Sequence, residues 1–217
     1  MMKKIVVLFI IVQLPLFCYS QKLRLGVCLN PHVDWFAENS SKLSPAGGKV
    51  GIEGGLLLEN YFAKNYALNS GIRLGIYGAK LQYNDSVYLK TDESEQLISP
   101  STKVTYKLQY ITVPIGLKLK TNQIGYMTYY AVLGFTPQIN IGAKAYARNI
   151  LDNAGVSKEI GLFNLGYHFG GGIEYGIGGN TSLIGGIVYN NGFVDILSRQ
   201  EAKQSLNMLT IMIGIMF

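Results

Sequence analysis

This sequence of 217 residues has few charged residues, few histidines and very little cysteine. Charged residues make up only 15%, and there are two histidines and two cysteines. Two histidines without the paired spacing of metal ligands argue against a zinc site, and we expect no metal and no cofactor. The formal net charge of +6 comes without any dense basic run, so the sequence gives no indication of nucleic-acid binding.

The first residues have the pattern of a secretory leader. Lys3 and Lys4 precede an apolar run from Ile5 to Phe17, and Cys18 and Ser20 give a small-x-small pattern before Gln21. We therefore predict a signal peptide over residues 1–20 and a mature domain over residues 21–217. Because Cys28 is then the only cysteine, the mature chain cannot form an internal disulfide.

No apolar run after residue 20 is long enough for a membrane-spanning helix, which needs about 20 residues. The mean hydropathy is nevertheless +0.20, and the sequence contains 26 glycines and 15 tyrosines. An exported chain that is this apolar and has no helical span is best explained by β-strands in contact with lipid, because only helices and closed barrels satisfy their backbone groups in a bilayer.

Eight segments alternate between apolar and small or polar residues, which is the period of a half-buried strand. In the clearest of them, Phe163, Leu165 and Tyr167 alternate with Asn164, Gly166 and His168. The expected strands cover residues 22–30, 49–62, 66–83, 103–120, 126–146, 163–176, 181–189 and 204–217. Pro114 lies inside the fourth, where we expect a bulge or bend because proline removes a ladder hydrogen bond.

The connections between these segments alternate in length. Residues 64–65, 121–125 and 177–180 form short turns, whereas residues 31–48, 84–102, 148–161 and 190–203 form long loops. Short turns on one side and long loops on the other are typical of an outer-membrane barrel. We therefore predict an all-β fold, an eight-stranded antiparallel up-and-down transmembrane barrel in the outer membrane of a Gram-negative bacterium, with its long loops outside and with membrane lipids as partners.

The orientation of the two strand faces separates this fold from a soluble, lipocalin-like barrel. The apolar faces carry large residues such as Phe135, Phe163 and Phe169, and the opposite faces carry many glycines. The interior of an eight-stranded barrel holds only modest side chains, so we expect the large residues to face lipid. Aromatic residues near strand ends should form interface girdles; we assign Trp35, Tyr66, Tyr126, Tyr129 and Tyr175 to them.

Charged residues on the glycine-rich faces should lie inside the barrel. Arg73 should lie diagonally from Glu53 across the hairpin between the second and third strands. Buried charges need partners, so we predict a polar network that plugs the lumen. We assign to it Glu53, Arg73, Lys118, His168 and Glu174. The chain ends in an alternating strand with Ile213, Ile215 and a terminal Phe217, which is similar to the signal that the barrel assembly machinery reads.

Three stretches resemble the PorT-like outer membrane β-barrel family, whose members are small barrels of the OmpA and OmpX type. They are LQYITVPIGLKLK (residues 108–120), VYNNGFVDIL (residues 188–197) and the terminal IGIMF. The resemblance spans nearly the whole mature chain and implies a barrel. The family contains secretion-machinery components and many members of unknown role, so it implies an envelope function without specifying one.

We expect a non-enzymatic barrel that acts as a structural or interaction platform, with an extracellular or envelope protein as its unknown partner. Two alternatives stay open: a narrow pore for small solutes, and a lipid-modifying enzyme that uses His32 with nearby serines at the outer rim. No catalytic set is complete in the sequence. Asp85-Ser86-Val87 resembles a bacterial O-glycosylation motif, and Ser86 is a candidate site.

Overall fold

The computed structural model describes residues 22–37, 42–198 and 204–217. The predicted signal peptide, residues 1–20, lies outside the described residues. Among the described residues, no helix has the length and apolarity needed to cross a bilayer.

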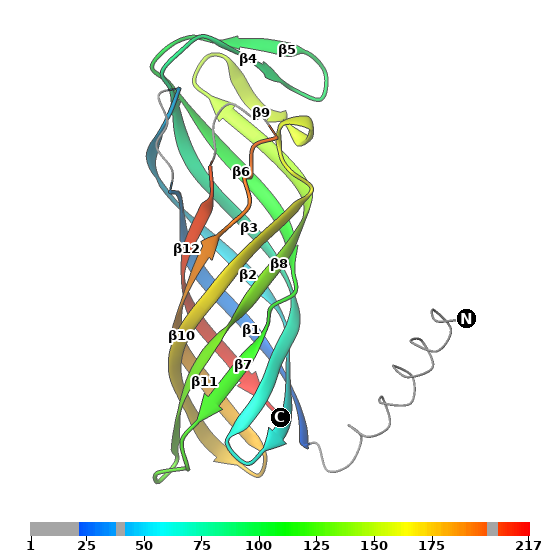
Figure 1. Cartoon of the computed structure of the whole chain (residues 1–217), viewed down its shortest axis with the longest axis vertical. Helices are drawn as coiled ribbons and strands as arrows, with labels where there is room; N and C mark the ends of the chain where they lie inside the picture. The colour runs from blue at the N-terminus through cyan, green and yellow to red at the C-terminus, as the bar shows by residue number, and fades with distance from the viewer. Residues whose placement is uncertain (1–21, 38–41, 199–203) are drawn as a thin grey trace, which may run out of the picture.

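Eight strand positions form a closed antiparallel ring (Figure 1). Each strand is hydrogen-bonded to its neighbours in chain order, and β1 also pairs with β12, so the sheet has no open edge within the ring. The predicted eight-stranded antiparallel barrel is confirmed. Its strands are β1 (Lys22–Phe36), β2 (Leu43–Ala63), β3 (Tyr66–Tyr83), β6 (Thr102–Thr112) continued by β7 (Ile115–Lys120), β8 (Met127–Ala147), β10 (Phe163–Gly178), β11 (Thr181–Gly192) and β12 (Leu206–Met216).

The expected irregularity at Pro114 is a break in the fourth strand of the ring. β6 ends at Thr112 and β7 begins at Ile115. Pro114 has no N–H to donate to the ladder. Instead, the neighbouring Val113 N–H donates to the carbonyl oxygen of Pro137 on β8 at 3.0 Å.

The first long loop was predicted wrongly. β1 runs on to Phe36 and β2 begins at Leu43, and the two strands pair as far as Asp34 and Lys49. The predicted loop over residues 31–48 is therefore mostly strand. Pro31 pairs with Ile52, and the alternation continues beyond it.

The loops at one end of the barrel form a folded cap. The connection between β3 and β6 contains a hairpin, β4 (Val87–Lys90) and β5 (Glu95–Ile98), and the next one contains β9 (Leu151–Gly155) and the 3-10 turn η2 (Ser157–Glu159). We call these elements the cap, and the end of the barrel that carries it the cap end. The C-terminus and the short turns lie at the other end, the turn end (Figure 1).

The barrel is taller than a membrane. A strand of 21 residues such as β2, tilted by about 40°, rises about 50 Å, which is twice the roughly 25 Å apolar band of an outer-membrane barrel. On β3 the outward side chains are mostly apolar from Tyr66 to Ile76, the length of about 9–11 residues that a bilayer requires. Beyond them, Lys80 and Gln82 face outward instead.

At the height where the outer face changes from apolar to polar, the interior changes from polar to apolar. Toward the cap end the inward positions carry large apolar and aromatic side chains, which form one buried core with the cap. Our expectation that the lumen holds only glycines, small polar groups and charges is therefore wrong for this half of the barrel. There the pattern is that of a water-surrounded barrel, apolar inside and polar outside. The core includes Phe36, Tyr77, Leu81, Tyr83, Tyr106, Leu108, Tyr110, Leu89, Ile98, Val156 and Ile196.

Candidate functional site

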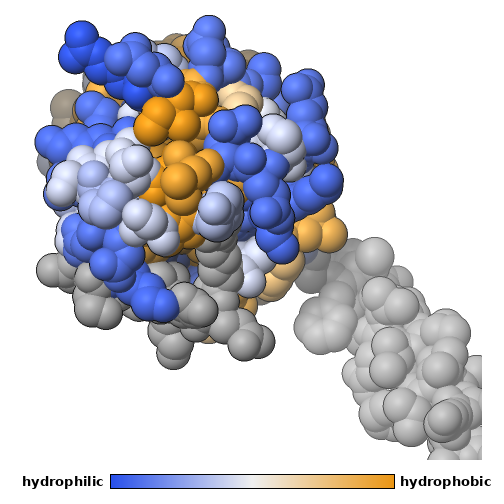
Figure 2. Space-filling view, turned by 90° about the horizontal axis from the view of Figure 1, so that it is seen from above, coloured by the Kyte–Doolittle hydropathy of each residue, from blue (hydrophilic) through white to orange (hydrophobic). Residues whose placement is uncertain are grey.

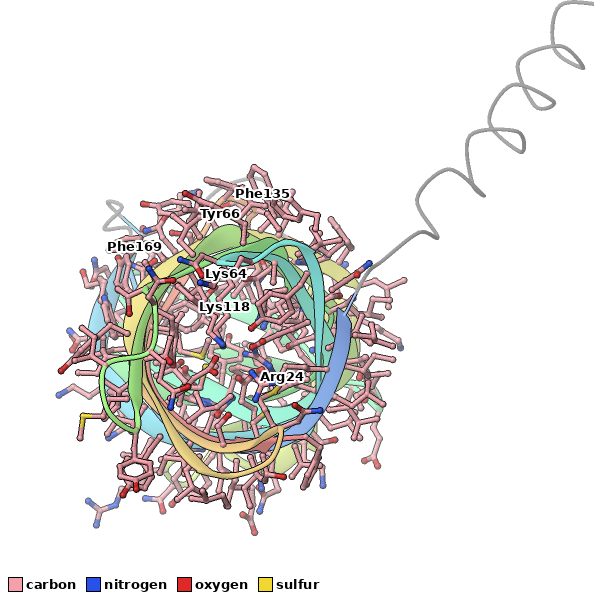
Figure 3. The ribbon with its side chains drawn as sticks, turned by 90° about the horizontal axis from the view of Figure 1, so that it is seen from below. Arg24, Lys64, Tyr66, Lys118, Phe135 and Phe169 are labelled. Carbon is pink, nitrogen blue, oxygen red and sulfur yellow. The ribbon has the colours of Figure 1, made fainter. Side chains whose placement is uncertain are left out.

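The turn-end half of the interior is filled by a cluster of paired charges. Lys118 of β7 is fully buried and forms ion pairs with Glu59 of β2 and with Glu174 of β10, the latter at 2.5 Å. Arg24 of β1 and Lys120 of β7 pair with the other oxygen of Glu174 at 3.1 and 2.6 Å. Figure 3 shows Arg24 and Lys118 pointing into the barrel from opposite walls. We call these five residues the turn-end ion cluster.

A second buried network lies at mid-height and centres on Glu53. Arg73 donates to Glu53 Oε1 at 2.8 Å, and Tyr77 donates its hydroxyl proton to Oε2 at 2.6 Å. Asn30 donates to Oε1 at 2.9 Å. Arg73 pairs directly with Gly55 in the β2–β3 ladder, so it reaches Glu53 on the diagonal, as the sequence predicts. Glu53 is a buried carboxylate with three donors, which makes this network rigid.

His168 lies inside the barrel but belongs to neither charged network. Its Nδ1 is 2.9 Å from Thr136 Oγ1, and Thr136 also donates to Asn190 Oδ1 at 2.8 Å. The sequence suggested a shared network with Glu174, but the structure places Glu174 in the turn-end ion cluster. The five predicted lumen residues are all inside, yet they belong to three separate groups.

Several members of these networks were not assigned to them from the sequence. Glu59 and Arg24 alternate with outward leucines, so the strand period already places them inside. Lys120 lies at the start of a turn, where an exposed side chain is the ordinary expectation. Tyr61 connects Glu59 with Lys120. Its hydroxyl donates to Glu59 Oε2 at 2.6 Å and accepts from Lys120 Nζ at 2.8 Å.

His32 and Asp34 lie within β1 and not, as predicted, at its junction with the first loop. Both side chains are buried inside the barrel, with His32 Nε2 3.4 Å from Asp34 Oδ2. The imidazole stacks on the Tyr77 ring at 4.8 Å and occupies space left by Gly51, where a Cβ would stand 2.2 Å from Nε2. Asp34 also accepts the backbone N–H of Gly78 at 2.9 Å. This pair therefore has a packing role beside the register shift between Gly48 and Ile52 in the β2–β3 ladder.

The described residues of the interior line a small cavity. A cavity of about 10 Å³, lined by Tyr77, Gln138 and Asn164 among others, lies at mid-height. That volume holds about one water molecule. Among the described residues, no group of three or more histidine, cysteine or acidic side chains is arranged to hold a metal ion.

The outer surface carries a continuous apolar belt below the cap. Leu25, Leu56 and Ile72 are 54%, 60% and 57% exposed on three neighbouring strands. Figure 3 shows Tyr66, Phe135 and Phe169 pointing away from the barrel axis. Exposed apolar residues on this scale are foreign to a water-soluble surface and typical of a lipid-facing one.

The decisive comparison is with protein families. A family model described as the outer membrane protein beta-barrel domain matches residues 19–198. The chain belongs to this family. No characterised sequence matches this outer membrane barrel in the comparison with curated proteins. The family and the fold place the protein in the outer membrane of a Gram-negative bacterium.

Solved structures of small outer-membrane barrels resemble it in fold at low sequence identity. Neisserial surface protein A (NspA) is 13% identical, with a TM-score of 0.50 over 91% of this chain and 97% of that one. Ail of Yersinia pestis, in complex with a heparin analogue, is 11% identical with a TM-score of 0.40, covering 90% and 99%. The OmpT protease of Escherichia coli is 8% identical with a TM-score of 0.44, covering 90% and 96%.

The predicted interface aromatics of this outer membrane barrel lie at both rims of the apolar belt. Tyr66, Tyr126, Tyr129 and Tyr175 are exposed near the turn end, where Tyr126 and Tyr175 are in ring contact at 6.0 Å. Trp35 lies toward the cap end against Tyr189. A chain of ring contacts that strand periodicity does not predict continues from Tyr189 through Phe169, Tyr167 and Phe193 to Phe135.

The remaining predicted residues lie on the surface. Ile213 is more than half exposed and Ile215 is half-buried on the outward face of β12, and Phe217, directly after β12, is more than half exposed. The backbone N–H of Phe217 donates to the Leu25 carbonyl at 2.7 Å and so closes the ring. Ser86 is exposed immediately before β4, so its hydroxyl is accessible at the cap.

Proposed function

We propose that this protein is a non-enzymatic interaction platform of the outer membrane, a closed barrel that holds a folded cap outside the cell for a protein partner of the envelope or surface. The observation that carries the proposal is the cap itself. Its elements are packed into the same buried core as the barrel end. A rigid, preformed surface binds a partner at a lower entropic cost than mobile loops do.

Hydrogen bonds hold the parts of the cap to one another. The carboxylate of Glu159 on η2 accepts the backbone N–H of Lys90 on β4 at 2.8 Å. The backbone carbonyl of Glu159 accepts the N–H of Ser198 in the connection between β11 and β12. Asp92, between β4 and β5, accepts the N–H of Ser157 at 3.1 Å. Three loops that are distant in sequence thus form one unit.

The exposed face of the cap carries apolar groups suited to a protein partner. Tyr88 and Leu97 are paired across the β4–β5 hairpin and are 62% and 49% exposed. Figure 2 shows a strip of hydrophobic residues crossing the otherwise mostly hydrophilic end face. Apolar surface rimmed by polar residues is typical of protein contact sites.

The pore and enzyme alternatives fit the interior less well. A pore requires a continuous water path, whereas two buried networks and an aromatic core fill this lumen. A pore would give discrete ion conductance across planar bilayers, and a closed barrel would give none. A lipid-modifying enzyme requires an accessible base, whereas His32 is buried. Lipid turnover that disappears on His32→Ala would support the enzyme instead.

The outward-facing residues of the barrel wall suggest two further partners, membrane lipids and the barrel assembly machinery. We propose that acyl chains cover the apolar belt and that the assembly machinery reads the outward Ile213, Ile215 and Phe217. The resemblance to PorT-like barrels favours an envelope-assembly or secretion role for the partner. Ser86 stays a candidate glycosylation site, which the intact mass of the native protein tests.

A photo-crosslinking amino acid placed at Leu97 tests the platform directly. In living cells of the native host we expect it to give a discrete protein adduct, because Leu97 lies on the exposed cap. The matched control is Ile124, an exposed apolar residue at the turn end, which is 66% exposed. Absence of a protein adduct from both Leu97 and Tyr88, or the same adduct from Ile124, would contradict the proposal.

A further inference from the structure

A row of lysines crosses four neighbouring strands on the outer wall of the barrel. Lys107 of β6 pairs directly with Lys144 of β8 on one side and with Gly78 of β3 on the other. Lys49 of β2 lies beyond Gly78, and its Cδ would stand 2.9 Å from a Cβ at that glycine. Gly78 therefore leaves room for the Lys49 stem to lie across the wall. Lys80 is exposed two residues further along β3.

These lysines repel one another, and none of them forms an ion pair with a described acidic residue. Directly opposed like charges on a sheet are destabilising, and Lys107 and Lys144 are such a pair. The ammonium group of Lys49 is likewise repelled by those of Lys107 and Lys80, and it is attracted by the carboxylate of Asp34, its direct partner in the β1–β2 ladder. Within the described ranges, no ion pair involves Lys49, Lys80, Lys107 or Lys144, whereas every lysine inside the barrel is paired.

A cavity adjoins the row where β6 and β8 meet the cap. It has a volume of about 210 Å³ and is lined by Lys107, Lys144, Gln109, Ser157 and Asp92, among others. The Asp92 carboxylate already accepts a hydrogen bond from the Ser157 N–H. Its negative charge repels an anion from that side of the cavity. The lysine side has the donors and the positive charge that a phosphate group requires.

The height of the row identifies the source of the phosphate. Toward the turn end, beyond Gly78, Gln109 and Gly142, the outward residues on the same strands are apolar, namely Ile52, Ile76, Ile111 and Ile141. The row therefore lies at the border of the apolar belt, where lipid headgroups are found.

We propose that Lys49, Lys80, Lys107 and Lys144 form a binding site for the phosphate groups of outer-leaflet lipid headgroups. Bound phosphates neutralise the mutual repulsion of the row and fix the barrel's rotation and depth relative to the leaflet. The site belongs to the outer wall and is independent of any partner on the cap face.

The test measures lipid retention by native mass spectrometry of the refolded full-length mature barrel, titrated in zwitterionic detergent with lipid A carrying two phosphates. A charged residue near an anionic membrane surface contributes about 1 kcal/mol, so Lys107→Gln/Lys144→Gln should weaken binding by about 30-fold. Dephosphorylated lipid A should bind the parent and this variant equally, because the acyl chains remain.

The control variant is Lys64→Gln/Lys90→Gln, which removes the same charge from an exposed turn and from the cap and should bind lipid A within about threefold of the parent. Misfolding is checked separately, since loss of the opposed pair should leave the melting temperature in lipid-free detergent unchanged or raised. Retention of lipid A by the row variant at the parent level, or equal loss in the control variant, would overturn the proposal.

Discussion

Replacing Lys118 by methionine is expected to lower the free energy of unfolding by about 3–5 kcal/mol, the usual effect of removing one partner from a buried ion pair. Lys118 is fully buried and is the central cation of the turn-end ion cluster. Without it, Glu174 keeps Arg24 and Lys120, but Glu59 keeps only the more distant Arg24 at 3.7 Å and the Tyr61 hydroxyl. Equilibrium denaturant unfolding in lipid vesicles measures the difference.

A rescue variant separates the charge effect from loss of packing. Adding Glu59→Gln to Lys118→Met should recover about half of the lost free energy, because the stranded carboxylate becomes neutral. The control is Lys64→Met, an exposed turn residue that should change stability by less than about 0.5 kcal/mol. If Lys118→Met were as harmless as Lys64→Met, the buried cluster would not exist as described.

An arginine in place of Ile72 is expected to destabilise the membrane-inserted barrel by about 2–4 kcal/mol, the cost of a cation near the middle of the lipid-facing band. Ile72 is 57% exposed and lies in the central part of the apolar stretch Tyr66–Ile76 of β3. Unfolding from phosphatidylcholine vesicles measures this cost. In detergent micelles the effect should be smaller, because the detergent layer adapts around the charge.

Thr105→Arg is the matched control for Ile72→Arg. Thr105 also faces outward, on the neighbouring strand β6. It lies beyond the apolar belt, between the outward Lys103 and Lys107. An added arginine there stays in water or among headgroups and should change stability by less than about 1 kcal/mol. Equal effects at the two positions would mean that the belt is not where the structure places it.

The strand periodicity made most of the barrel predictable from sequence. Alternation placed Leu23, Leu25 and Val27 outside and Arg24 and Glu53 inside, and the structure agrees. The diagonal contact between Arg73 and Glu53 followed from the tight turn that joins β2 and β3. These predictions succeed because a period of two fixes the face of every residue once one face is assigned.

Near the cap the apolar side chains face inward and the polar ones outward. This reversal could not be predicted, because the alternation keeps the same period of two residues. Tyr77, Leu81 and Tyr83 follow Arg73 and Gly75 on the same inward series, but the solvent outside changes from lipid to water at that height. Alternation alone carries no signal for where the bilayer ends. The outward lysines at positions 80, 107 and 144 were that signal, since they interrupt an otherwise apolar face.

The cap could not be assembled from the sequence for a different reason. Its contacts join residues far apart in the chain, such as Lys90 with Glu159 and Asp92 with Ser157. Each segment read as an ordinary polar loop, because hydrogen bonds between loops leave no local periodicity. The same holds for the division of the inward charges into separate networks, which depends on which strands face each other across the lumen.

Spin labels on the outward positions of β3 test most directly whether apolar side chains face lipid up to Ile76 and water begins beyond it. Single cysteines at Leu68, Ile72, Ile76, Lys80 and Gln82, in a Cys28→Ala background, would be labelled and reconstituted in vesicles. We expect high accessibility to oxygen and low accessibility to a polar nickel reagent at positions 68, 72 and 76, and the reverse at 80 and 82. Nickel accessibility at position 72 equal to that at position 82 would contradict this expectation.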